Sequence, residues 1–300
     1  MVSAPRRLGI VGVGLLGTAV AVRVLARGIE VAGYDTVPER VGALTGNGMR
    51  AAASVAEAAA GADAVITILP TPDVVERVWL APGGLLDVAP TTAVLMQMST
   101  VSPALNVTLG AAANARGFRF LETPISGTST AVSQGAGTIF VGGDAALTER
   151  FRPLFDAITG TTVHVGAIGD ASVAKLAANL IGGINAIALA EALVLGAKAG
   201  VAPAKLLDAL RQSPVRSGTM DMRGPLMVTH TFAPHIRLDL FLKDFRLMLE
   251  EGNRLGVALP LTSVANQLCT AASAAGHGAE DLAAVITTLE RLAGLDAPRT

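Results

Sequence analysis

Short apolar runs alternate with helix-forming stretches from Arg7 to about Val165, and no other feature of the sequence constrains the fold as strongly. Several runs are apolar at every position, which is typical of strands buried on both faces of a parallel sheet. The expected strands are Leu8–Val13, Glu30–Tyr34, Ala64–Leu69, Ala93–Met98, Phe118–Leu121 and Thr138–Val141. The pattern predicts an α/β domain whose mostly parallel sheet is covered by helices on both faces.

The stretches between these strands have helix-forming composition. Pro38, Pro72 and Pro103 each stand where a helix would begin, a position that tolerates the missing amide hydrogen. The expected helices of this part are Leu16–Arg27, Pro38–Thr45, Val55–Ala60, Asp73–Trp79, Pro103–Arg116 and Ala145–Ala157.

The alternation stops after Val165. Asp170 to Gly200 consists almost wholly of helix-forming residues, whereas Pro, Gly and Met are dense between Ser213 and Pro234, which predicts an irregular connection. Further helices are expected at Pro203–Gln212, Lys243–Leu255, Leu261–Ala275 and Glu280–Leu292. We therefore expect an α/β domain over 1–165 and an all-α domain over 166–300, joined by a long interdomain helix at about 170–199.

A glycine motif follows the first expected strand and opens the first expected helix. It reads Gly12-Val13-Gly14-Leu15-Leu16-Gly17, in which the glycines permit a tight turn, close approach of a pyrophosphate and close strand–helix contact. The amide hydrogens at the helix N-terminus would bind the phosphates. The motif predicts a Rossmann domain that binds a dinucleotide through Gly12, Gly14, Leu15, Leu16 and Gly17.

Asp35 ends the second expected strand, eighteen residues after Gly17. A carboxylate at this position can accept both ribose hydroxyls of the adenosine half and would repel a 2′-phosphate, which favours NAD over NADP. Asp35 could instead cap the helix that follows it, and the two roles are compatible. Arg40 is close enough in sequence to tolerate a phosphate, so NADP stays possible.

Lys175 and Asn179 lie four residues apart near the start of the long helix, so their side chains share one face. A lysine in a desolvated site can exchange a proton with a substrate hydroxyl or carbonyl. The alternative is a lysine that reaches solvent from a helix end and an asparagine bonded to a neighbouring carbonyl. Spacing alone does not decide between these interpretations.

The segment Gly166-x-x-Gly169-x-Ala171-x-x-x-Lys175-x-x-x-Asn179 resembles the catalytic segment of the β-hydroxyacid dehydrogenase family, which includes 3-hydroxyisobutyrate dehydrogenase and tartronate semialdehyde reductase. The resemblance extends over nearly the whole chain. Further matches are Ile10 to Gly17, Leu69-Pro70, Ser99-Thr100, Glu122-Thr123-Pro124-Ile125-Ser126-Gly127-Thr128 and Lys243-Asp244.

This resemblance implies an NAD(P)-dependent oxidoreductase that transfers a hydride between nicotinamide and a small 3-hydroxy acid, or the matching aldehyde acid. Lys175 would be the general acid–base, and no metal is implied. The substrate, a small carboxylate, would contact Ser126, Gly127, Thr128 and Asn179. Leu69, Pro70, Thr100 and Lys243 would contact the cofactor. We expect the active site between the two domains, at the carboxyl ends of the strands.

Several positions depart from the family pattern. Glu122 replaces the usual Asp, Thr123 an Ala, Thr128 the second Gly of the substrate loop, and Ala171 a Gly. Thr128 would add a side chain near the carboxylate pocket, so the sequence names neither the substrate nor the reaction direction. Nearby cationic residues, His235 and Arg237, would either attract an acidic substrate or be solvated loop charges.

Composition limits the partners and the compartment. A net charge of −1 gives nucleic acid little to bind, and one cysteine, Cys269, fits a reducing cytoplasm. The long apolar run contains Asn179 and Glu191, so we expect a buried helix and no membrane. Excess apolar surface on Leu261–Ala275 and Asp281–Leu292 predicts a homodimer or homotetramer.

Two other functions are compatible with this architecture. Imine reductases share the two-domain layout but usually have another residue in place of Lys175. A non-catalytic dinucleotide-binding scaffold would not need Lys175, Asn179, Ser126 and Gly127 together. Both alternatives are therefore less well supported by the sequence.

Overall fold

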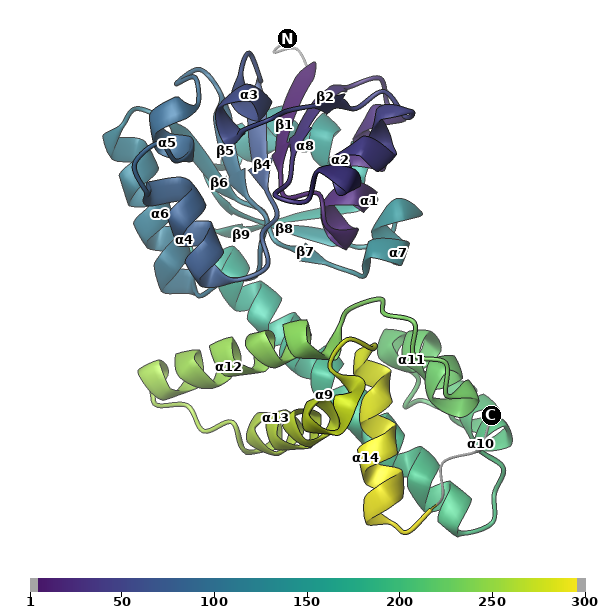
Figure 1. The fold of residues 1–300 in the computed structure, drawn as a ribbon. Helices are drawn as coiled ribbons and strands as arrows, with labels where there is room; N and C mark the ends of the chain where they lie inside the picture. The colour runs from purple at the N-terminus through teal and green to yellow at the C-terminus, as the bar shows by residue number, and fades with distance from the viewer. Residues whose placement is uncertain (1–4, 296–300) are drawn as a thin grey trace. The chain divides into compact units, whose positions relative to one another are not determined.

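The computed structural model describes residues 5–295 and divides into two compact units, Met1–Leu176 and Ala177–Thr300 (Figure 1). The long helix α9 (Asp170–Lys198) begins in the first unit and continues into the second. The first turns of α9 therefore belong to the first unit, and the domain boundary expected between residues 165 and 166 stays a prediction.

The first unit contains a nine-stranded sheet in the order β3-β2-β1-β4-β5-β6-β8-β7, with β9 paired to β8. Neighbours from β3 to β6 run parallel, β8 runs antiparallel to β6 and β7, and β9 is parallel to β8. The strands are β1 (Arg7–Val11), β2 (Glu30–Tyr34), β3 (Arg50–Ala51), β4 (Ala64–Thr67), β5 (Val94–Gln97), β6 (Arg119–Glu122), β7 (Ile125–Ser126), β8 (Thr138–Gly143) and β9 (Thr161–Gly166). The predicted Rossmann sheet is confirmed, and its order reverses at β1, between β2 and β4.

Helices cover both faces of this sheet, as Figure 1 shows. One apolar cluster joins α1 and α8 to the sheet through residues such as Val20 and Phe155, and the other joins α4 and α6 through Trp79 and Leu109. The helices of this unit are α1 (Leu15–Leu25), α2 (Pro38–Thr45), α3 (Val55–Ala59), α4 (Pro72–Leu80), α5 (Leu85–Val88), α6 (Pro103–Ala115), α7 (Ser129–Ser133) and α8 (Ala145–Ile158). The inner strands β1, β4, β5 and β6 are buried along nearly their whole length because each face of the sheet has its own core.

Three strands, β3, β7 and β9, were not predicted from the sequence pattern. Strands β3 and β7 have two residues each, too few to show a periodicity. Strand β9 reads Thr-Thr-Val-His-Val-Gly and is largely exposed, so it lacks the apolar run of the inner strands. Pairing with β8, and not composition, makes β9 a strand.

The second unit is helical, as predicted. Its helices are the rest of α9, α10 (Pro203–Arg211), α11 (Gly218–Thr229), α12 (Leu238–Leu255), α13 (Pro260–Ala272) and α14 (Val285–Leu292), with short π and 3₁₀ turns at Ser273–His277 and Leu282–Ala284. Helices α9 and α12 pack closely at Gly183. A Cβ atom there would lie 2.7 Å from the rings of Phe241 and Phe245, so glycine sets the separation of the two helices.

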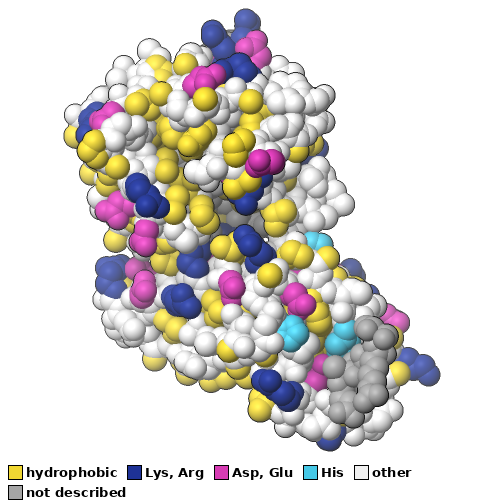
Figure 2. All heavy atoms as spheres, in the orientation of Figure 1, with side chains coloured by type: hydrophobic (Ala, Val, Ile, Leu, Met, Phe, Trp, Pro, Cys, Tyr) yellow, Lys and Arg dark blue, Asp and Glu magenta, His cyan; other side chains and the backbone are white. Residues whose placement is uncertain are grey.

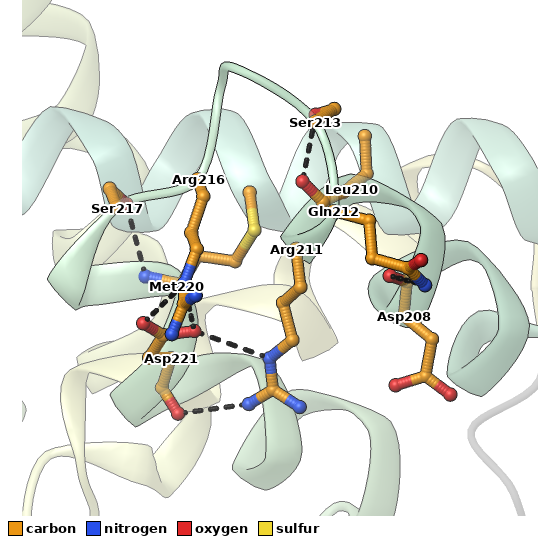
Figure 3. Close-up of polar contacts among 9 residues, drawn as sticks. All are labelled: Asp208, Leu210, Arg211, Gln212, Ser213, Arg216, Ser217, Met220 and Asp221. Carbon is orange, nitrogen blue, oxygen red and sulfur yellow. Dashed lines mark hydrogen bonds and ion pairs between the residues drawn. The ribbon is translucent and has the colours of Figure 1, made fainter.

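The prediction of an irregular connection from Ser213 to Pro234 is wrong, because α11 occupies the middle of this segment. Ser217 Oγ accepts the amide hydrogen of Met220 at 3.1 Å and caps the helix. Arg211, at the end of α10, and Arg216 converge on Asp221 in the first turn of α11 (Figure 3). Arg216 Nε lies 3.0 Å from Asp221 Oδ2. These contacts order a segment whose composition resembles a loop.

Helix α9 is long and apolar enough to cross a membrane by length and composition alone, and 39% of its most apolar window is buried. Core helices of soluble proteins pass the same test. Gly183, near the middle of α9, is packed against aromatic rings of α12. This packing favours a core helix over a membrane span.

Candidate active site

Two of the three glycines in the motif lie where no other residue would fit. Gly12 has φ +98°, and a Cβ atom there would lie 2.1 Å from the carbonyl oxygen of Ile68. A Cβ on Gly17 would lie 2.1 Å from the carbonyl oxygen of Gly12, which keeps α1 close to β1. Gly14 is different, because a Cβ atom there would meet nothing within 4 Å. The first and third glycines are thus required by the chain itself, whereas the second leaves room for a ligand.

Helix α1 begins beside that open space. Gly14 is its N-cap residue and supplies no side-chain hydrogen bond, and the first turn contains no acidic residue. The amide hydrogens of a first helical turn need acceptors, and the N-terminal end of the helix attracts negative charge. A pyrophosphate would meet both requirements, so this turn fits the dinucleotide that the sequence predicts.

Asp35 follows β2 and is only 6% exposed in its side chain. Its Oδ2 accepts the amide hydrogen of Val13 at 2.7 Å, and its Oδ1 accepts that of Val37 at 2.9 Å. Arg40 donates to the same Oδ1 at 3.2 Å. Asp35 therefore ties the end of β2 to the glycine loop, and the ribose contact stays a prediction.

The loops after β4 and β5 are joined to each other. Thr67 and Gln97, the last residues of the two strands, are register partners. Beyond them the amide of Leu69 donates to Ser99 Oγ at 2.8 Å. Leu69-Pro70 and Ser99-Thr100 thus leave the same edge of the sheet as Gly12, which is where a doubly wound sheet binds its ligand.

A buried polar network underlies these loops. Gln97 Nε2 donates to Asn106 Oδ1 at 3.0 Å, and Asn106 Nδ2 donates to Glu122 Oε1 at 2.8 Å and to Ser172 Oγ at 2.9 Å. Glu122 Oε2 accepts the amide hydrogen of Gly169 at 2.6 Å. Burial raises the pKa of Glu122, and hydrogen bonds from Ser172, Gly169 and Asn106 oppose this. This network was not predicted from the sequence, although Gln97, Asn106 and Glu122 stand out as polar residues in mostly apolar elements.

The loop expected to hold the substrate carboxylate contains Ser126, Gly127 and Thr128. Ser126 ends β7 opposite Thr138, and Gly127 has φ +154°. Thr128 Oγ1 accepts the amide hydrogen of Ala131 at 3.1 Å and caps α7. The Thr128 hydroxyl, expected beside a carboxylate pocket, thus has an acceptor role within its own loop.

Lys175 and Asn179 stand one turn apart on α9, and both are at least nine-tenths buried. Burial of Lys175 argues against a side chain that merely extends to solvent. Asn179 Nδ2 donates to Asp244 Oδ2 at 2.8 Å, and Lys243 Nζ lies 2.9 Å from Asp244 Oδ1. Asp244 of α12 therefore brings together Asn179 and Lys243, two predicted site residues. Asp244 itself was matched to the family but given no role.

The segment before α12 is fixed by a buried carboxylate. Asp281 Oδ2 accepts the amide hydrogens of His235 and Ile236 at 3.0 and 3.1 Å, while Arg223 Nε lies 3.1 Å from Asp281 Oδ1. The backbone at His235 is thereby held in place.

Metal and thiol chemistry find no support in the described residues. No three His, Cys, Asp or Glu side chains between residues 5 and 295 gather as a metal site. Burial raises the pKa of the Cys269 thiol to about 12, so this cysteine is a poor nucleophile.

Known protein families match nearly the whole chain. The NAD-binding domain of 6-phosphogluconate dehydrogenase matches residues 7–166, and the NAD-binding domain of NADP-dependent 3-hydroxyisobutyrate dehydrogenase matches residues 169–289. The chain is 33% identical over 290 residues to 2-(hydroxymethyl)glutarate dehydrogenase of Eubacterium barkeri, covering 96% of each protein. The chain belongs to the β-hydroxyacid dehydrogenase family.

Solved structures agree with this family. The β-hydroxyacid dehydrogenase described here superposes on 3-hydroxyisobutyrate dehydrogenase from Salmonella typhimurium with a TM-score of 0.86 and 30% identity, over 94% of this chain and 99% of that one. An imine reductase from Myxococcus stipitatus gives a TM-score of 0.64 at 21% identity, over 94% and 99% of the two chains. That likeness shows a shared fold alone, so imine reduction is the more distant alternative.

Proposed function

We propose that this β-hydroxyacid dehydrogenase transfers a hydride between a nicotinamide dinucleotide and a small 3-hydroxy acid, or the matching aldehyde acid, with Lys175 as general acid–base. The observation that carries the proposal is the buried Lys175 one helical turn from Asn179, in a chain with a complete glycine motif. The buried lysine also argues against a scaffold without catalysis, since a binding module has no use for it.

The residues at the carboxyl edge of the sheet fit a dinucleotide. Gly12, Gly14 and Gly17 with the first turn of α1 would hold the pyrophosphate, and Leu69, Pro70 and Thr100 would contact the rest of the cofactor. Lys243 is proposed to close over it. When bound, nicotinamide supplies the hydride acceptor or donor at the hydroxyl-bearing carbon.

Residues of the chain itself transfer the proton and orient the substrate. Lys175 removes the proton from the substrate hydroxyl during oxidation and returns it to the carbonyl oxygen during reduction. Asn179, held by Asp244, orients the substrate beside Lys175. Ser126 and Gly127, with Thr128 capping the loop, are proposed to bind the carboxylate.

NAD is the proposed cofactor, on the strength of Asp35. Its carboxylate is nearly enclosed and would repel a 2′-phosphate. Arg40 is 48% exposed and lies against Asp35, which is the feature that keeps NADP use open.

Self-association is proposed for the second unit, where Figure 2 shows hydrophobic side chains at the surface. Ile181 and Leu195 on α9 are 61% and 73% exposed, and Leu261 on α13 is 65% exposed. We expect a homodimer or homotetramer in the cytoplasm. Light scattering tests the assembly, and a monomer at micromolar concentration would refute it.

A substrate panel tests the proposed function. Turnover with NAD and NADP is measured on hydroxyisobutyrate, glycerate, threonate, hydroxypropanesulfonate and β-hydroxy amino acids, with a cyclic imine as comparison. Oxidation of at least one hydroxy acid with NAD preferred is expected. Reduction of the imine together with no turnover of any hydroxy acid would overturn the proposal.

A further inference from the structure

The first turn of α9 carries amide hydrogens that need acceptors, and its own sequence supplies few. Gly169, which precedes the helix, has no side chain, and the Asp170 carboxylate accepts from Ala167 at 2.8 Å instead. Glu122, at the end of β6, supplies the missing acceptor for these amide hydrogens. Its Oε2 accepts from the Gly169 amide at 2.6 Å, and Ser172 donates to its carboxylate through both hydroxyl and amide. A carboxylate from another element therefore caps the helix that carries Lys175.

We propose that Glu122 is a positioning residue for Lys175, and this rests on the acid–base role proposed above. Lys175 follows Ser172 by three residues, so it lies one helical turn from the cap. A frayed first turn would displace the lysine ammonium group from the substrate oxygen. The carboxylate of Glu122 fixes that turn relative to the sheet.

The surroundings of Glu122 suit a glutamate. A Cβ on Gly142 would lie 2.7 Å from Glu122 Oε2, so the absence of a side chain at Gly142 makes room for the longer acid. Asn106, Gly169 and Ser172 all donate to the carboxylate. A glutamine would turn an amide group with its own hydrogens toward some of these donors, leaving buried groups unpaired.

The same network reaches the cofactor loops. From Glu122 it passes through Asn106 and Gln97 to Ser99, whose hydroxyl accepts from the Leu69 amide. Gln97, Asn106 and Glu122 are fully buried and Ser99 is 5% exposed, so water does not compete for these bonds. One network therefore fixes the loop proposed to contact nicotinamide and the turn that precedes the proposed proton carrier.

The test compares Glu122→Gln and Glu122→Asp with the wild-type protein. Asp144→Ala is the matched control, because Asp144 is also a helix-capping carboxylate but caps α8, through a 2.6 Å bond from the Leu147 amide. Turnover is expressed per NADH-binding site, so that misfolded protein does not count. Glu122→Gln should lower kcat by roughly 10- to 100-fold and change KM for the cofactor less, because Glu122 contacts the Gly169 amide directly but the cofactor loops only through Asn106 and Gln97. Glu122→Asp should restore part of kcat, and Asp144→Ala should leave it within about twofold.

Two further measurements do not depend on activity. Hydrogen exchange of residues 167–176 and the rate of Lys175 acetylation, both read by mass spectrometry, should rise in Glu122→Gln and not in Asp144→Ala. If the wild-type protein oxidises no hydroxy acid, the proposed function fails while these measurements still decide whether Glu122 fixes Lys175.

Unchanged exchange and acetylation in Glu122→Gln, or a kcat within about twofold of wild type in an active enzyme, would overturn the proposal. Should Glu122→Gln fail to fold, Ser172→Ala removes one donor to the same carboxylate. It should show the same changes at smaller size, and wild-type values would likewise overturn the proposal.

Discussion

Asn179 and Asp244 are joined by a 2.8 Å hydrogen bond between α9 and α12, and both side chains are buried. Lys243 contacts the other oxygen of Asp244. Removing the carboxylate therefore takes one partner from Asn179 and one from Lys243. We expect Asp244→Ala to reduce the free energy of unfolding by about 3–5 kcal/mol, as for other broken buried ion pairs. Denaturant unfolding measures this. Glu251→Ala on the same helix, whose partner Arg254 is 58% exposed, should cost much less, because solvent screens this ion pair. Equal losses in the two variants would contradict the burial argument.

Lys175→Ala removes the proposed proton carrier without touching the glycine loop. Turnover of the best hydroxy acid should fall about 10²- to 10⁴-fold, the usual contribution of general acid–base catalysis. NADH affinity, followed by fluorescence titration, should stay near that of the wild type. Lys198→Ala, at the exposed end of the same helix, is the control and should keep full turnover. A Lys175→Ala enzyme with near-normal turnover would exclude the assigned role.

Gly14→Ala and Gly12→Ala should separate binding from folding. A methyl group on Gly14 meets no protein atom, so the variant should fold normally but bind NAD at least about tenfold more weakly, a loss of about 1.4 kcal/mol. A methyl group on Gly12 would collide with Ile68 and require φ +98°, so that variant should also unfold at a lower temperature. Thermal melting and NAD titration check both. Normal NAD affinity in Gly14→Ala would mean that the dinucleotide binds elsewhere.

Asp35→Asn removes the charge proposed to exclude a 2′-phosphate while leaving an oxygen for the Val13 amide. The ratio of kcat/KM for NADP to that for NAD should rise at least about tenfold, because Arg40 would no longer be neutralised. Arg40→Ala in the Asp35→Asn background should reverse the gain. An unchanged ratio would leave Asp35 with the purely structural role of fixing the glycine loop.

The buried Glu122 carboxyl should make stability depend on pH. Burial raises its pKa above 4.5 in the folded state, and its hydrogen-bond partners Asn106, Gly169 and Ser172 carry no charge. The folded state therefore holds this proton more tightly than the unfolded state. The stability of the wild type relative to Glu122→Gln should be greatest below pH 4.5 and should decline as pH rises through the folded-state pKa. Urea unfolding from pH 4 to 8 measures the difference, and an increase with pH would contradict it.

The parallel sheet, α9 and the glycine turn were all predictable from sequence, because each depends on local periodicity or on residues with one steric purpose. Helix α11 was not, since Pro225 and Gly224 resemble loop residues until Arg211, Arg216 and Ser217 are seen to fix its first turn. Tertiary contacts overrode composition there.

The candidate site shows the same limit. Lys175 and Asn179 are neighbours on one helix, so spacing brings them together. Asp244 is 65 residues from Asn179, and Glu122 is 47 residues from Gly169. No local pattern encodes such pairs, and a polar residue in an apolar strand indicates burial without naming its partner.

Two adjacent glycines of α9, Gly182 and Gly183, differ in the space around them, and this difference matters for protein engineering. Replacing helical glycines with alanine is a common route to thermostability. At Gly182 the nearest obstacle to an added Cβ is Thr219 Oγ1, 3.8 Å away, so the exchange is sterically open. At Gly183 the same methyl would press on Phe241 and Phe245 and displace α12, the helix that carries Lys243 and Asp244. Of these two adjacent glycines, one therefore offers a target for stabilisation, whereas an added methyl group at the other would lower stability through overpacking.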